Sequence, residues 1–177
     1  MHLAVEKREK DEATPMPSYD VVVMGAGPYG LSAAAHLRAQ GLNVAVFGKP
    51  LHYWSAYMPE GMLLRSYWWA SNLSDPEGKY RMTDYFKYKG IAQAPKLLPI
   101  EQFIDYGLWF QQQLVPDVDE TLIKMIQHRK GLYVVTLEDG RVVSTKTVVM
   151  APGLQYYTYI PEEYAHLPAS LVSHSSD

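Results

Sequence analysis

Three glycines near the N-terminus, Gly25, Gly27 and Gly30, have the spacing of a site that holds a diphosphate. They follow a short apolar run, residues 21–24, and precede a helical pattern over residues 28–40. In such a unit the first glycine permits a tight turn, the second lets a pyrophosphate approach the backbone, and the third lets the helix lie close to the strand. The helix N-terminus adds unpaired N–H groups and a positive dipole end. The pattern therefore predicts dinucleotide binding.

The second half of this unit supplies a strand but lacks the acidic residue that usually follows it. Gly41 stands where a helix C-cap belongs, and residues 43–47 form a second apolar run. An Asp or Glu normally bonds a ribose hydroxyl after that strand, but here Gly48 and Lys49 occupy the place. We expect the ribose contact to come from elsewhere, with backbone groups at Phe47 or Gly48 as candidates. Lys49 has two interpretations, a partner for the 2′-phosphate of NADP or, as we prefer, an exposed loop lysine.

The next segment, residues 48–115, is distinguished by its aromatic content. Residues 48–110 hold 14 of the chain's 22 aromatic side chains and all four tryptophans. A solvated linker does not have this composition, so we expect an insertion that packs on the first unit or frames a binding site. Within it we expect a short helix capped by Thr83 and ending at Gly90, then a longer helix after Pro99.

Residues 119–150 have the pattern of a three-stranded β-meander. Lys130-Gly131 and Asp139-Gly140 separate the apolar runs, and Asp-Gly is a strong hairpin signal because both residues tolerate positive φ. The last run should return to the main sheet. The whole order predicts an α/β fold, a Rossmann-like domain over residues 18–177 with a parallel sheet. We expect the meander strands over residues 121–128, 132–137 and 142–149.

Composition limits the classes of function. The formal net charge of −3 gives no reason to expect nucleic acid or an anionic membrane as a partner, and no run approaches the roughly 20 apolar residues of a membrane span. The chain has no cysteine, and its six histidines show no metal-binding spacing, so we expect no metal. We expect a cytoplasmic protein, with residues 1–17 as a mobile N-terminal arm.

Four stretches together resemble a known family. GAGPYGLSAAAHL (residues 25–37) is similar to the FAD-binding start of the two-dinucleotide-domain flavoproteins, above all the flavin-containing, Baeyer–Villiger and N-hydroxylating monooxygenases. MLLRSYWWASNLSDP (62–76) resembles the segment that in relatives passes near the flavin ring, and TKTVVMAPG (145–153) resembles the strand and Ala-Thr-Gly motif that closes over the FAD site. AHLPASLVSHSSD (165–177) is similar to the inter-domain segment that carries a His-Ser pair, here His174 and Ser175.

This resemblance implies FAD as the cofactor and an oxidoreductase of the NAD(P)H-dependent flavin monooxygenase type. In a full-length relative NADPH reduces the FAD, and the reduced flavin transfers one oxygen atom from O₂ to a small-molecule substrate. Arg65 is the candidate for a phosphate or a developing negative charge, and Ser66 for a hydrogen bond to the flavin ring. The catalytic residues and the substrate stay unknown. The expected FAD-binding residues are Gly25, Ala26, Gly27, Pro28, Tyr29, Gly30, Phe47, Gly48, Arg65, Ser66, Ala151 and Gly153.

Some features depart from the family pattern. Pro152 replaces the usual Thr of Ala-Thr-Gly, which removes a hydroxyl and a backbone N–H. No second glycine triplet follows Gly30, so we expect the NADPH domain to be absent here, with NADPH used only by a full-length relative. The fragment alone could then be inactive, and it could form a homo-oligomer through the surface left by the missing domain. Two alternatives stay open, a nucleotide-binding module without turnover and a small NAD(P)-binding reductase.

Overall fold

The computed structural model describes residues 16–168 and 170–172 of the 177-residue chain. The arm expected over residues 1–17 lies almost wholly outside the described residues, and the His174-Ser175 pair lies entirely outside them.

The first three elements form the expected βαβ unit. Strand β1 (Ser18–Met24) leads into helix α1 (Pro28–Ala39), and strand β2 (Val44–Phe47) follows. Pro28 begins α1 at a position where a helix needs no N–H donor, and Gly41 ends the turn after it with a φ of +77°. The predicted strand, helix and C-cap are therefore all present, with the first strand three residues longer at its start.

Three further strands complete a single five-stranded sheet. Its order is β2-β1-β7-β6-β5, with β1 parallel to both β2 and β7 and with antiparallel pairing among β5, β6 and β7. The start of β7 pairs with β6, and β7 pairs with β1 as far as Met150. Both the meander and its return to the parallel sheet are confirmed. The three strands are β5 (Ile123–Arg129), β6 (Leu132–Leu137) and β7 (Val142–Met150).

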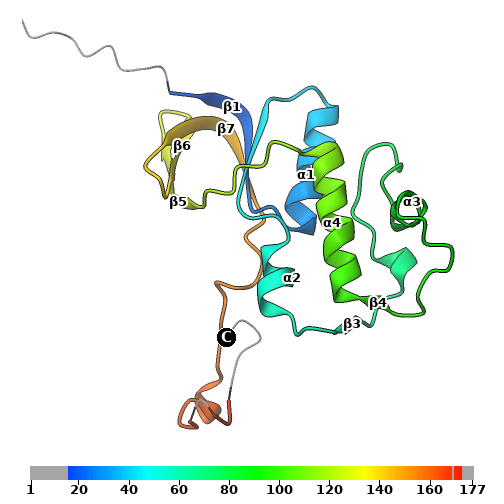
Figure 1. The fold of residues 1–177 in the computed structure, drawn as a ribbon. Coiled ribbons are helices and arrows are strands. Elements are labelled where there is room, and N and C mark those ends of the chain that lie inside the picture. The colour runs from blue at the N-terminus through cyan, green and yellow to red at the C-terminus, as the bar shows by residue number, and fades with distance from the viewer. Residues whose placement is uncertain (1–15, 169, 173–177) are drawn as a thin grey trace, which may run out of the picture.

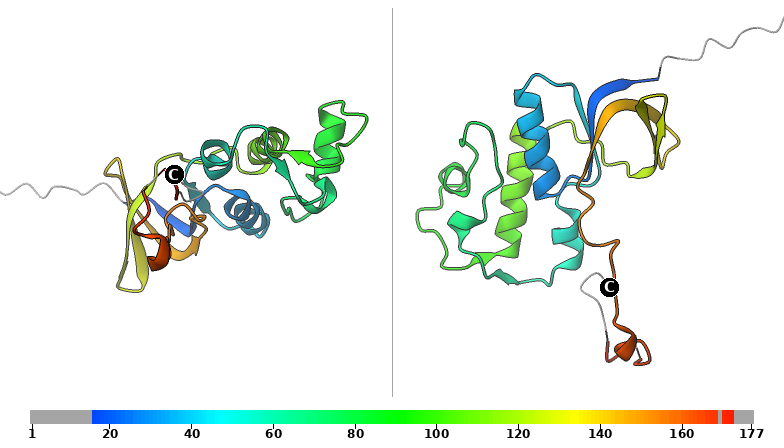
Figure 2. Two further views of the ribbon diagram at one scale, coloured as in Figure 1. Left: turned by 90° about the horizontal axis from the view of Figure 1, so that it is seen from below. Right: turned by 180° about the vertical axis from the view of Figure 1, so that it is seen from behind.

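Alternation along β1 divides the core between two faces of the sheet. Val21 and Val23 belong to the main core, together with buried residues of α1 such as Leu31 and Ala34. Val22 points the other way and packs with side chains of the meander in a smaller core. The parallel strands therefore lie between a helical layer and the folded-back meander, as the opposed positions of α1 and β5–β6 in Figure 1 and Figure 2 show.

The aromatic segment packs on the helical side and shares the main core. Helices α1 and α4 lie side by side, and α3 lies on the far side of α4 from α1 (Figure 1). The longer helix expected after Pro99 is present as α4, and its Phe103, Tyr106 and Phe110 side chains are buried in the main core. The elements of this segment are α2 (His52–Tyr57), β3 (Leu63–Leu64), η1 (Trp68–Ala70), α3 (Met82–Tyr88), β4 (Leu98–Pro99) and α4 (Ile100–Leu114).

The start of α3 corrects one expectation. Thr83 is not its N-cap, because the helix begins at Met82, two residues earlier than a Thr83 cap implies, and Arg81 takes the cap position. The Asp84 carboxylate accepts the Arg81 N–H at 3.3 Å, and the Asn72 side-chain oxygen accepts the Met82 N–H at 2.8 Å. These two acceptors satisfy donors at the start of the helix, and the Thr83 hydroxyl makes no capping bond there. The helix does end before Gly90, which has a φ of +68°.

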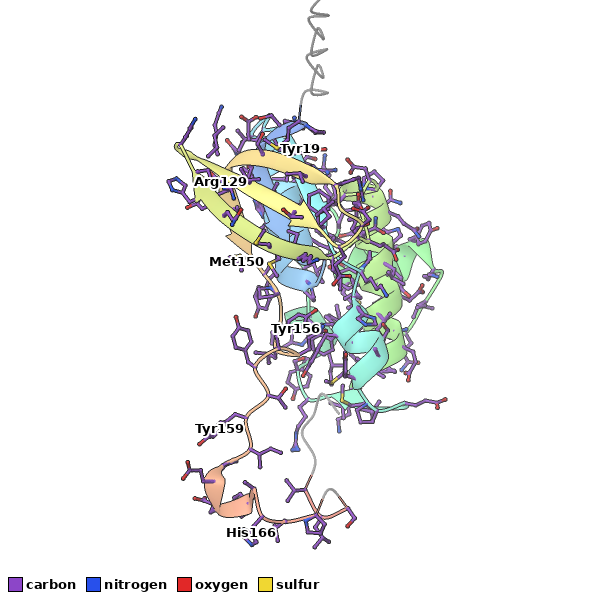
Figure 3. The ribbon with its side chains drawn as sticks, turned by 90° about the vertical axis from the view of Figure 1, so that its left-hand side faces the viewer. Tyr19, Arg129, Met150, Tyr156, Tyr159 and His166 are labelled. Carbon is purple, nitrogen blue, oxygen red and sulfur yellow. The ribbon has the colours of Figure 1, made fainter. Side chains whose placement is uncertain are left out.

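Beyond the sheet, the chain extends away from the body as an arm with one short 3₁₀ turn, η2 (Glu162–Tyr164). Figure 3 shows Tyr156 close to the body and Tyr159 and His166 further along the arm. Tyr159 is 73% exposed, so the arm leaves aromatic surface in solvent. The homo-oligomer expected through the surface left by the missing domain stays a prediction. None of the helices in the described ranges is long and apolar enough to cross a membrane.

An ionic cluster attaches the end of β2 to the meander. The Arg141 guanidinium donates to carboxylate oxygens of Asp119 and Asp139, each at 2.6 Å, and to the Thr121 hydroxyl at 2.9 Å. The Asp119 carbonyl in turn accepts the Gly48 N–H at 2.8 Å. Hydrogen bonding from Arg141 lowers the pKa of Asp119 to about 2.

We expect this cluster to make stability depend on acid pH. The folded-state pKa of Asp119 lies below the ordinary value of 3.8, so its contribution is complete above that value and is lost as the pH falls toward 2. Asp119→Asn should reduce the free energy of unfolding by about 1 kcal/mol at pH 7, because both partners are partly exposed. Urea unfolding measured between pH 7 and 2 should show this difference shrinking toward zero. Glu120→Gln is the control, and a difference that stays constant with pH would contradict the assignment.

Candidate functional site

Two of the three motif glycines, Gly25 and Gly30, lie in contacts that leave no room for a side chain. A Cβ on Gly25 would lie 2.1 Å from the carbonyl oxygen of Ala151, and a Cβ on Gly30 would lie 1.9 Å from the carbonyl oxygen of Gly25. The Ala151 N–H donates to the Met24 carbonyl at 2.8 Å. The segment after β7 thus lies directly on the glycine turn, as the motif ending in Ala151 and Gly153 led us to expect.

Gly27 differs from its two partners because nothing lies within 4 Å of the position that its Cβ would take. Its φ of −77° is open to any residue, so neither packing nor backbone strain requires glycine here. Gly27 is the N-cap of α1, and no side chain caps that helix end. The first intrahelical bond runs from the Leu31 N–H to the Gly27 carbonyl at 2.9 Å. The absence of a side chain therefore exposes backbone N–H groups and the positive end of the helix dipole.

The end of β2 adjoins the glycine turn through its backbone. The Gly25 N–H donates to the Phe47 carbonyl at 2.8 Å, and Gly48 has a φ of +131°. A Cβ on Gly48 would lie 3.3 Å from the Gly25 Cα, so the two turns are in contact. The N–H of Gly48 is already used by the Asp119 carbonyl. Lys49 is exposed and also lines the cavity described below, so both interpretations of that residue stay open.

Leu51 holds the glycine turn from the other side, and no motif in the sequence points to it. Its backbone is left-handed, with a φ of +53°, and its side chain is 1% exposed. Its N–H donates to the Ala26 carbonyl at 3.1 Å. A Cβ on Gly107 of α4 would lie 2.9 Å from Leu51 side-chain carbons, so the missing side chain of Gly107 makes room for Leu51. The turn is thereby fixed against the helical layer.

These elements surround one cavity of about 960 Å³. The glycine turn and the start of α1 form one wall, α2 and residues 70–74 a second, and the ends of the meander strands a third. Its volume lies near the upper end of the usual range for ligand sites. Ten of the twelve predicted FAD-binding residues line it: Gly25, Ala26, Gly27, Pro28, Tyr29, Phe47, Gly48, Ser66, Ala151 and Gly153.

The other two predicted residues lie outside this lining. Gly30 is buried beneath the glycine turn, where it acts through packing. Arg65 is exposed in the loop after β3, and no ion pair joins it to the described part of the chain. Ser66 faces the cavity, and its hydroxyl lies 2.9 Å from the Ser71 hydroxyl. A role for Arg65 at the cofactor therefore stays a prediction without support from its position.

Asn72 and Asp75 organise the turn before α3 through hydrogen bonds to backbone groups. The buried Asp75 carboxylate accepts the N–H groups of Glu77, Lys79 and Tyr80 at 3.0 to 3.2 Å. The Asn72 side chain donates to the Trp69 carbonyl at 2.6 Å in addition to its bond at the start of α3. Both side chains are thus occupied by protein groups.

Hydrogen bonds between the aromatic segment and α1 complete the second wall. The Ser32 hydroxyl of α1 accepts the Ser74 N–H at 3.0 Å, and His36 lies 2.9 Å from the Ser74 hydroxyl. The Tyr106 hydroxyl accepts the Leu73 N–H at 3.0 Å and donates to the Tyr80 carbonyl. Burial raises the pKa of Tyr106, so this phenol stays neutral. No local pattern in the sequence indicates these contacts, because they join residues far apart in the chain.

The charged side chains on the cavity wall give a small excess of positive charge, which suits an anionic ligand. Lys49 and Lys124 line it against one carboxylate, that of Glu138. Apolar and aromatic side chains, among them Trp54 and Phe103, line the part near α2 and α4. Within the described ranges, no three His, Asp or Glu side chains are grouped as a metal site would need.

One curated protein is similar to this chain over most of the chain's length. No model of a known protein family matches the chain. A curated relative, one of the subunits of opine oxidase from Agrobacterium tumefaciens (strain Ach5), is 29% identical over 150 residues, which is 84% of this chain and 26% of that protein. The chain therefore spans about a quarter of the length of this relative.

Solved structures with a similar fold include those of flavin monooxygenases. A flavin-containing monooxygenase from Stenotrophomonas maltophilia superposes with a TM-score of 0.70 at 24% identity, over 83% of this chain and 42% of that one. The enzyme OTEMO, in complex with FAD and NADP, superposes with a TM-score of 0.62 at 20% identity, over 84% and 28%. The fold is that of the Rossmann-like FAD-binding domains of flavin monooxygenases. The expected α/β fold and the resemblance stated from the sequence are both confirmed.

Proposed function

We propose that this chain binds FAD and forms the flavin-binding part of an oxidoreductase of the NAD(P)H-dependent flavin monooxygenase type. The open position at Gly27 carries the proposal, because it lies on the cavity wall beside the uncapped start of α1. A diphosphate is the ligand group that needs both a close backbone and unpaired N–H donors. The relatives span longer chains, so the activity of the whole protein is part of the proposal.

The residues present fit FAD along the whole cavity. The glycine turn and the N–H groups of α1 would hold the diphosphate. The meander end, with Leu122, Lys124 and Glu138, would hold the adenosine half. The wall formed by Ser66, Trp54 and Phe103 would enclose the flavin half and exclude water from one side of it. When bound, FAD supplies the redox chemistry, while the protein binds and orients it.

A spectrum of the purified protein tests the proposal. We expect flavin bands near ~370 and ~450 nm, and we expect denaturation to release FAD rather than FMN. A protein purified without flavin should show the same bands after FAD is added and unbound FAD is removed. A folded protein that stays colourless after this loading would contradict FAD binding.

Addition of NADPH to the loaded protein then separates the oxidoreductase from a binding module. Rapid bleaching of the ~450 nm band would show that this chain also accepts the reductant. Stable colour would favour a module that holds FAD and depends on further protein for turnover. NADPH binding by a protein that refuses FAD would favour the small NAD(P)-binding reductase.

A further inference from the structure

Glu138 supplies the one carboxylate on the lining of the cavity, as far as the described residues go. It directly follows β6, and its side chain is exposed. Its backbone N–H donates to the Leu122 carbonyl at 2.9 Å, which fixes the residue beside the start of β5. A backbone hydrogen bond therefore holds the residue that carries this carboxylate at the meander wall of the cavity.

Backbone hydrogen bonds connect this position to the end of β2, where dinucleotide-binding units usually carry their ribose-binding acid. Asp119 connects the two places, because its N–H donates to the Val46 carbonyl at 2.9 Å and its carbonyl accepts the Gly48 N–H. Three residues later, Leu122 accepts the bond from Glu138. Gly48, Leu122 and Glu138 all line the same cavity.

Two backbone groups at the end of β2 are already used within the protein. The Gly48 N–H is used, and the Phe47 carbonyl already accepts the Gly25 N–H. A ribose hydroxyl donates best to a charged acceptor. The neighbouring acids Asp119 and Asp139 both accept from Arg141, whereas the carboxylate of Glu138 has no ion pair or hydrogen bond to the described residues.

We propose that Glu138 binds the ribose hydroxyls of the adenosine half of FAD, in place of the acid that is missing after β2. This assignment rests on the proposed FAD-binding function. The carboxylate reaches the ribose from the meander, and Gly48 leaves that end of β2 free of a side chain. A carboxylate there also disfavours a 2′-phosphate, which selects FAD over NADP.

The test measures dissociation constants of FAD, ADP and 2′,3′-dideoxy-ADP for wild type, Glu138→Gln and the control Glu120→Gln. The control removes an exposed carboxylate that does not line the cavity. We expect Glu138→Gln to weaken FAD and ADP about tenfold and to leave dideoxy-ADP unchanged, because only the hydroxyl bond loses its charge. Glu120→Gln should match wild type for all three ligands.

Two results would overturn the assignment. Glu138→Gln could bind FAD and ADP as wild type does, or it could lose ADP and dideoxy-ADP equally. The melting temperatures of both variants confirm that each is folded. A folded wild type that binds neither FAD nor ADP overturns the proposed function as well, and so the two failures are distinguishable.

Discussion

Gly27→Asp should weaken FAD binding by about 100-fold or more while leaving the fold intact. The φ of −77° accepts any residue, and no atom lies within 4 Å of the new Cβ, so the folded protein loses little. The added carboxylate would occupy the open space beside the start of α1. It would cap the free N–H groups and repel the diphosphate. Fluorescence titration with FAD measures the loss, and thermal melting should stay within about 2 °C of wild type.

Gly27→Asn provides the matched control for this substitution. Asparagine has almost the same shape and also caps a helix, but it carries no charge. We expect its effect on FAD affinity to be clearly smaller than that of aspartate. Equal losses from both variants would mean that the space itself, rather than the charge of the ligand, decides binding. Unchanged FAD affinity in Gly27→Asp would contradict the placement of the diphosphate at this position.

Gly30→Ala should act in the opposite way and destabilise the fold. Its Cβ would lie 1.9 Å from the Gly25 carbonyl oxygen, a backbone atom that the Ala151 contact keeps from moving away. Overpacking against a fixed backbone costs about 3 kcal/mol, which lowers the melting temperature of a chain of this size by about 10 °C. Thermal and urea unfolding without ligand measure this directly.

Gly27→Ala is the control for stability, since it adds the same methyl group three residues earlier in open space. Its melting temperature should be close to that of wild type. A Gly30→Ala protein as stable as wild type would show that α1 can move away from the turn. The three glycines would then differ less in their importance for stability than their surroundings indicate.

Much of the fold was predictable because the local signals are strong and agree. Two apolar strands, the glycine turn and the C-cap at Gly41 define the βαβ unit, and Asp139-Gly140 marks the hairpin. The predicted start of α3 is wrong because the Met82 N–H is satisfied by Asn72, a residue ten positions earlier. No local rule about Thr83 could include that partner. Helix α2 was not predicted, because its N-cap residue Leu51 has a left-handed backbone although it is not a glycine.

The residues of the candidate site likewise fall into those that a local motif predicts and those that tertiary structure places. Residues within the glycine motif and the segment ending at Gly153 line the cavity as expected, because each motif carries its own geometry. Arg65 is a candidate through the family resemblance, and in the structure it is exposed and does not line the cavity. Glu138 has no local signal, because only the pairing of the meander brings it near Gly48. That proximity depends on tertiary structure rather than on spacing.

Titration of the folded wild-type chain with FAD, followed by competition with ADP, tests the central claim most directly. We predict one FAD per chain, displacement of FAD by ADP, and loss of both ligands together in Gly27→Asp. These results would place the diphosphate on the glycine turn. A folded chain that binds no FAD, or one that binds FAD equally well with and without the Gly27→Asp change, would contradict that claim.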